Sequence, residues 1–219
     1  MQDIIVLSDQ ILVYVNSIVF WVCAIVFWAK SKKSELKSQK RFFIGISFFF
    51  IFWGIMRIMF IFSNYYYEID LSLYSFYWKI ASTIGIGGLL SILIVLEIYM
   101  VKSKFIFSII TFIGLLLAII LPINGTEISG ARLATYIFLP TGALSILGLY
   151  IYLYIKLSGR ARHETGIIAW GLTLIFLGYT LTIELIKHIF NTELISPIAS
   201  VVMICGALLY TTMYYFKKA

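Results

Sequence analysis

The stretch Ile80–Met100, IASTIGIGGLLSILIVLEIYM, decides the fold. It holds 21 residues with a single charged side chain, Glu97, and about 20 mostly apolar residues form a helix long enough to cross the hydrocarbon core of a bilayer. Six further apolar stretches follow the same pattern along the chain. Their length favours helices, because strands of a membrane barrel alternate in hydropathy over only about ten residues. The sequence therefore predicts an all-α polytopic membrane protein built as a seven-transmembrane-helix bundle.

The seven predicted spans occupy most of the chain, and the composition agrees with them. Hydrophobic residues make up 62% of the sequence and charged residues 12%, with a mean hydropathy of +1.00. The segments between spans are short, so we expect one domain over residues 1–219 and no separately folded domain between the helices. The spans are predicted at residues 11–29, 42–63, 71–100, 105–121, 133–155, 166–187 and 195–216.

The basic residues lie mainly on one side of the predicted spans. Of the 17 Lys and Arg residues, 13 fall in segments 30–41, 101–104, 156–164 and 217–218, whereas the opposite segments carry mainly acids. Because cytoplasmic segments of membrane proteins are rich in Lys and Arg, we expect an outside N-terminus, a cytoplasmic C-terminus and a multi-pass protein of the cell membrane. The net charge of +7 is explained by this pattern and by anionic lipid. The bilayer is therefore the expected partner, and nucleic acid is not.

Catalytic constellations are missing from the sequence. His163 and His188 fall on opposite predicted sides of the membrane, so they share neither a metal ion nor a catalytic dyad. No G-x-S-x-G, H-E-x-x-H or Walker motif occurs. The seven-helix topology resembles that of the microbial rhodopsins, but residues 195–216 contain no lysine to hold a retinal. We expect no enzyme, no cofactor and no metal site.

Three charged side chains fall in one layer of the predicted bundle. Arg57 and Glu184 each stand seven residues before an asparagine at a predicted outer helix end, which places them about 10 Å inside the membrane. Lys79 lies about 13 Å inside by the same measure. Charges within spans are costly and often functional, so this layer is predicted to be either a site for a polar or anionic small ligand or a structural ion pair. In the second case the Lys79 and Arg57 side chains extend to the interface.

Glu97 stands apart, near the cytoplasmic end of the third predicted span. Two interpretations stay open for it. One is an interfacial salt bridge with a basic residue of a neighbouring segment. The other is a site of proton binding or gating.

The leading functional expectation is a receptor-like or sensory membrane module. Such a module binds a small ligand, or senses a membrane stimulus, and signals through a separate cytoplasmic protein partner. The alternative is a small-solute transporter of the seven-helix type, and a less favoured one is an intramembrane enzyme or a subunit of a membrane complex. A transporter needs polar residues along a path to both faces, and apart from Glu97 the inner halves of the predicted spans are nearly all apolar.

Overall fold

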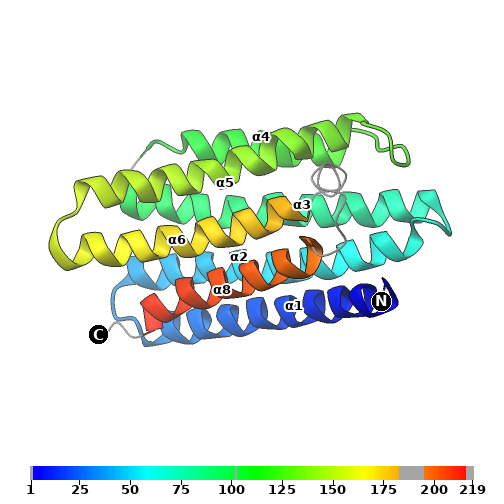
Figure 1. Ribbon diagram of the computed structural model, residues 1–219. Coiled ribbons are helices and arrows are strands. Elements are labelled where there is room, and N and C mark those ends of the chain that lie inside the picture. Colours follow the sequence, from blue (N-terminus) through cyan, green and yellow to red (C-terminus); the bar gives the residue numbers. More distant parts are fainter. Residues whose placement is uncertain (1, 102, 183–194, 216–219) are drawn as a thin grey trace.

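The computed structural model describes residues 2–101, 103–182 and 195–215 (Figure 1). Apart from short connections, these residues are helical, as the sequence predicts. The helices keep the labels of Figure 1: α1 (Gln2–Lys33), α2 (Lys37–Tyr66), α3 (Leu71–Leu96), η1 (Glu97–Val101), α4 (Ile106–Ile120), α5 (Gly130–Lys156), α6 (Gly159–Leu181) and α8 (Ile195–Tyr215).

Six of these helices are long and apolar enough to cross a membrane: α1, α2, α3 with η1, α5, α6 and α8. The prediction of a multi-pass membrane bundle is confirmed to this extent. The predicted span 105–121 forms the shorter α4, whose 15 residues cover about 22 Å, against roughly 30 Å of hydrocarbon. It begins after two left-handed residues, Lys104 and Phe105, and it ends just before Pro122, which lacks an N–H group to continue it.

Consecutive helices run up and down, so the connections gather at two ends of the bundle (Figure 1). We call the end with Glu68, Asp70 and Glu127 the acidic end. The opposite end, which includes Lys33 and Arg160, is the basic end. At the acidic end Asp70 caps α3, because its carboxylate accepts hydrogen bonds from two backbone N–H groups of the first turn, at 2.8 and 3.2 Å.

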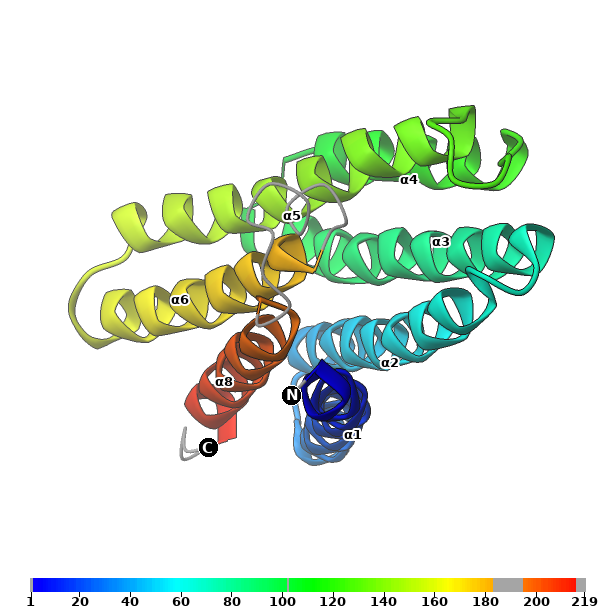
Figure 2. The same cartoon turned by 45° about the vertical axis from the view of Figure 1, so that its right-hand side comes forward.

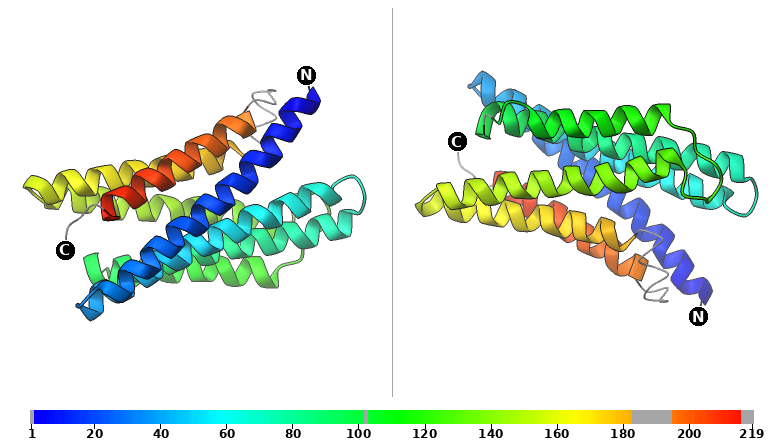
Figure 3. Two further views of the ribbon diagram at one scale, coloured as in Figure 1. Left: turned by 90° about the horizontal axis from the view of Figure 1, so that it is seen from below. Right: turned by 90° about the horizontal axis from the view of Figure 1, so that it is seen from above.

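The six long helices contact one another in a closed ring. Around the ring, α1 packs on α2, α2 on α3, α3 on α5, α5 on α6, α6 on α8, and α8 on α1. The shorter α4 lies outside this ring against α3 and α5 (Figure 2). Helix α1 runs diagonally across one side of the bundle and approaches the start of α8 at its own N-terminal end (Figure 3).

Small residues allow α6 and α8 of the ring to approach closely. A Cβ atom built on Gly206 would lie 2.6 Å from the carbonyl oxygen of Gly171, and one built on Gly178 would lie 2.6 Å from that of Ala199. No side chain fits between these backbones. In lipid, where helices gain nothing from hiding apolar surface, such close packing is a main source of association.

Aromatic side chains fill the inside of the ring and connect helices that are not neighbours in it. Trp53 of α2 contacts Phe176 and Tyr179 of α6 with ring centroids 5.4 Å apart. On the basic side, the Tyr150 hydroxyl of α5 lies 3.2 Å from that of Tyr210 on α8. The core is therefore a packed aromatic interior rather than a pore.

Candidate functional site

A partly enclosed pocket of about 140 Å³ lies in the acidic half of the bundle. Every helix of the ring contributes to its wall, and α4 does not. Three of its lining residues, Asn64, Tyr136 and Pro140, are exposed. The lining residues are Val13, Arg57, Phe60, Ile61, Asn64, Trp78, Thr135, Tyr136, Leu139, Pro140, Tyr179, Thr182 and Ser196.

Arg57 is the charged residue of this wall among the described residues. Its side chain is 4% exposed, and its Nη1 donates to the Thr182 hydroxyl at 3.4 Å. The hydroxyls of Thr182 and Thr135 donate to backbone carbonyls at 2.7 and 3.0 Å, so their lone pairs stay available as acceptors. The wall therefore offers both donors and acceptors to a bound molecule.

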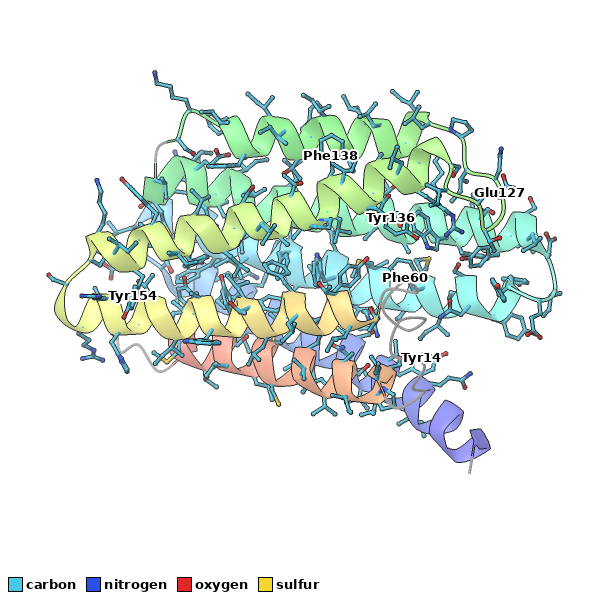
Figure 4. The ribbon with its side chains drawn as sticks, turned by 45° about the horizontal axis from the view of Figure 1, so that its top comes forward. Tyr14, Phe60, Glu127, Tyr136, Phe138 and Tyr154 are labelled. Carbon is cyan, nitrogen blue, oxygen red and sulfur yellow. The ribbon has the colours of Figure 1, made fainter. Side chains whose placement is uncertain are left out.

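Aromatic rings from four helices line the pocket together with Arg57. Phe60 of α2 and Tyr136 of α5 both pack against Trp78 of α3, with ring centroids 6.4 and 6.0 Å from it and interplanar angles of 74° and 79°. Tyr179 of α6 provides the fourth ring. Figure 4 shows Phe60 and Tyr136 in the acidic half of the bundle, on α2 and α5.

The α5 part of this wall contains a proline, Pro140. It stands inside the helix, where a proline removes one backbone hydrogen bond and usually bends the helix. Because Pro140 also lines the pocket, the backbone hydrogen bond that α5 lacks is at the candidate site.

A second buried guanidinium, that of Arg132, lies over the ring of Trp78 and was not predicted as a site residue. Its Cζ is 4.5 Å from the Trp78 ring centroid and 5.2 Å from that of Tyr74. Its Nη2 donates to the Gly125 carbonyl at 2.8 Å, and the residue is 1% exposed. Arg132 thus attaches the α4–α5 connection to α3 and adds positive charge next to the pocket.

Lys79 does not line the pocket with Arg57. Its Nζ donates to the Leu121 carbonyl at 2.9 Å, at the C-terminal end of α4. The last carbonyls of a helix have no partner within it and carry partial negative charge. Lys79 therefore supplies a cation to the negative end of α4.

Glu97 is 2% exposed and supplies the matching anion at the other end of α4. Its carboxylate accepts hydrogen bonds from the backbone N–H groups of Phe107 and Ser108 at 3.0 and 2.8 Å. It also accepts from the Ser103 hydroxyl at 2.6 Å and from the Ser108 hydroxyl. All of these donors are N–H and hydroxyl groups at or just before the α4 N-terminus. The continuous span of α3 and η1 therefore carries one charge of the correct sign for each end of α4, Lys79 on α3 and Glu97 on η1.

Glu184 lies outside the described residues, so its pairing with Arg57 stays a prediction. His188 lies outside them as well. Within the part of the chain that the structure describes, no three His, Cys, Asp or Glu side chains gather as metal ligands.

Two buried polar side chains stand one helical turn deeper than the pocket lining. Asn16 follows Val13 by three residues on α1, and Ser200 follows Ser196 by four on α8, so each pair shares a helix face. Both are fully buried, and neither the Asn16 amide nor the Ser200 hydroxyl has a hydrogen-bond partner among the described residues. The polar character of the pocket therefore extends toward the core.

Comparison with known proteins adds no identity to this arrangement. The chain significantly matches no protein-family profile, no curated protein and no solved structure.

Proposed function

We propose that this chain is a sensory membrane module that binds a small polar or anionic ligand in the pocket and signals through its basic end. The observation that carries the proposal is the composition of the pocket wall, to which all six helices of the ring contribute. A ligand in such a pocket touches every long helix at once. Its binding energy can therefore favour one arrangement of those helices over another. A protein that switches between two conformations requires such a difference in ligand affinity.

A continuous series of aromatic rings leads from the pocket toward the basic end. Consecutive ring centroids are 5.1 to 5.9 Å apart, within the range of favourable aromatic pairs. The series, which we call the aromatic column, consists of Tyr179, Trp53, Phe49, Phe50, Tyr210, Tyr214 and Phe43.

The column supports the proposal because its first ring lines the pocket and its last ring lies below a basic side chain. Lys30 Nζ is 5.4 Å from the Phe43 ring centroid. Packed rings cannot shift singly without leaving voids. A displacement of Tyr179 by a ligand is therefore expected to reposition the helices at the basic end.

The proposed topology has seven spans, with α4 as the short one, the N-terminus outside and the basic end in the cytoplasm of a cell-membrane protein. The basic residues of that end support this orientation. In this orientation the pocket faces the exterior, and a separate cytoplasmic protein receives the signal.

A small-solute transporter is the second candidate, and the position of Pro140 favours it. A proline inside a helix usually favours a bend, and a bend at Pro140 would let one half of α5 move relative to the other, as alternating access requires. The two functions differ in flux, because a sensor binds its ligand without releasing it on the opposite side.

The test fills the pocket covalently and observes the basic end. Thr135→Cys, in a background with Cys23→Ala and Cys205→Ala, is reacted with benzyl methanethiosulfonate in lipid nanodiscs. Hydrogen exchange is then measured by mass spectrometry in the connections 34–36 and 157–158. We expect altered exchange there after labelling, and none after labelling Glu127→Cys on the exposed α4–α5 connection. Unchanged exchange with the pocket filled would rule out the coupling.

A further inference from the structure

Helix α4 is too short for a bilayer of ordinary thickness. Its 15 residues cover about 22 Å, against roughly 30 Å of hydrocarbon, and it lies outside the ring of long helices (Figure 2). We propose that the outer face of α4 is a binding surface for lipid acyl chains and that it fits a bilayer about 8 Å thinner than the average. The proposal goes beyond the sensory function. It uses the transmembrane placement of the bundle and no part of the pocket.

The side chains of α4 are arranged inside out compared with a helix that faces water. The residues that it buries against α3 and α5 are small or polar, namely Ser108, Thr111, Gly114 and Ala118. The residues that it exposes are large and apolar, whereas a surface helix of a soluble protein presents polar residues on its outer face. These exposed residues are Ile106, Ile109, Ile110, Phe112, Ile113, Leu116, Ile119 and Ile120. Hydrocarbon is therefore the medium that this face fits.

Acyl chains suit this face better than a second copy of the chain or another helix. Helices that associate in lipid approach through small residues, which let their backbones come close. On α4 the small residues already face the bundle, where a Cβ atom on Gly114 would collide with Phe138 of α5. All residues of α4 are described, and none of the exposed ones is glycine, alanine or serine. Acyl chains adapt to such protruding side chains without a close approach of backbones.

The thickness of the hydrocarbon follows from what lies beyond each end of α4. Residues 121–129 connect α4 to α5 without a helix, and they include the polar side chains of Asn124 and Glu127. Just before the helix, Lys104 and Phe105 have left-handed backbone conformations. Irregular backbone does not contact lipid within the hydrocarbon, because its N–H and C=O groups would lack partners there. The hydrocarbon beside α4 must therefore end close to the helix ends.

Two charged side chains hold α4 at this depth. Lys79 Nζ donates to the Leu121 carbonyl, and the Glu97 carboxylate accepts from the N–H groups of Phe107 and Ser108. Both charges belong to the continuous span of α3 and η1, whose 31 residues cover about 46 Å. Because both ends of α4 are bound to this longer span, α4 keeps its depth, and tilting would only shorten the thickness that it crosses. The lipid must adapt instead, and a bilayer adapts to a short apolar surface by thinning.

The test compares the lipids that touch two faces of the same protein. A bimane fluorophore is attached to Ile113→Cys on α4 or to Ile25→Cys on α1, in a background with Cys23→Ala and Cys205→Ala. Both native residues are exposed, and the α1 span of 24 residues covers about 36 Å, enough for an ordinary bilayer.

The full chain is reconstituted into mixtures of two phosphatidylcholines, one with monounsaturated chains of 14 carbons and one with chains of 22 carbons. One of the two lipids is brominated at its double bonds, so that it quenches the fluorophore on contact. Exchanging which lipid is brominated gives the relative affinity of each face for short and long chains.

We expect the α4 face to prefer the 14-carbon chains roughly 2- to 5-fold, and the α1 face to show no preference for them. Ile109→Cys, exposed on the same face of α4, should repeat the result and replaces Ile113→Cys if that variant fails to fold. Equal preferences at α4 and α1, or a preference of the α4 face for the longer chains, would overturn the proposal. An α4 site that neither brominated lipid quenches would also overturn it, because protein would then cover this face.

Discussion

Replacing Glu97 should detach the N-terminus of α4 from the bundle. In the native chain its carboxylate accepts four hydrogen bonds from the start of α4, two of them from the backbone N–H groups of Phe107 and Ser108. Glu97→Ala removes every acceptor at once and leaves those N–H groups without a partner. Glu97→Gln keeps one acceptor oxygen, but it directs an amide N–H₂ group toward donors.

The expected loss follows from these bonds. A missing N-cap costs about 0.5–2 kcal/mol, and a hydrogen bond to a charged group contributes about 1.5–3 kcal/mol. The four bonds share one carboxylate and are not additive. We therefore expect Glu97→Ala to lower the free energy of unfolding by about 3 kcal/mol and Glu97→Gln by about 2 kcal/mol.

The assay is reversible unfolding in mixed micelles by titration with sodium dodecyl sulfate, followed by circular dichroism. Hydrogen exchange at residues 106–109 reports the local effect, and the amides of Phe107 and Ser108 should exchange faster in both variants. Glu127→Gln, an exposed acid on a connection, is the matched control and should stay within about 0.5 kcal/mol of the native chain. A Glu97→Gln variant that matches this control in both measurements would refute the capping role.

Four further substitutions test the packing and the surroundings of the pocket. Gly114→Ala should destabilise the chain by about 1–3 kcal/mol, because the new Cβ would lie 2.3 Å from Phe138. In Gly87→Ala the new Cβ meets nothing within 4 Å, so this variant should be neutral or gain up to about 1 kcal/mol from helix propensity. Both are measured in the same detergent titration. Arg132→Leu should cost about 2–4 kcal/mol through its lost bond to a carbonyl and its lost ring contacts, and limited proteolysis should then cut the α4–α5 connection more readily. Asn16→Leu should raise the unfolding midpoint by removing a buried amide that has no hydrogen-bond partner among the described residues, worth about 1–2 kcal/mol. A lower midpoint would show that the amide is satisfied in the native protein.

The helices of this bundle could be predicted from sequence because long apolar runs have few alternatives. The stretch Ile80–Met100 becomes the second half of α3 and most of η1, in one continuous span with the residues before it. The predicted segment 105–121 differs from α4 by one residue at each end, because Phe105 and Leu121 are the residues that cap the helix.

The candidate site was predictable only in part. The sequence singled out Arg57, because a charged side chain within an apolar span is evident from the sequence alone. The sequence did not indicate that Lys79 contacts α4 instead of lining the pocket. Its partner is the backbone carbonyl of Leu121. Because every residue carries such a carbonyl, the sequence does not distinguish the one that Lys79 binds.

The burial of Arg132 could not be predicted from its place in the sequence. This residue stands at the edge of a predicted outer connection, where a basic residue normally contacts water. In the structure α5 begins at Gly130, so Arg132 lies in its first turn and packs over rings of α3 that are more than 50 residues earlier in the chain. Contacts between such distant segments follow from the helix packing, which the local pattern does not encode.

The most direct test of the account asks whether the pocket opens to the outer side of a membrane bundle. Single cysteines at Thr135, Glu127 and Lys33, in a background with Cys23→Ala and Cys205→Ala, are exposed to a small membrane-impermeant thiol reagent in intact cells. The account predicts labelling of Thr135→Cys in the pocket and of Glu127→Cys at the acidic end, and labelling of Lys33→Cys only after the cells are opened. Labelling of Lys33→Cys in intact cells, with Thr135→Cys and Glu127→Cys protected, would contradict it.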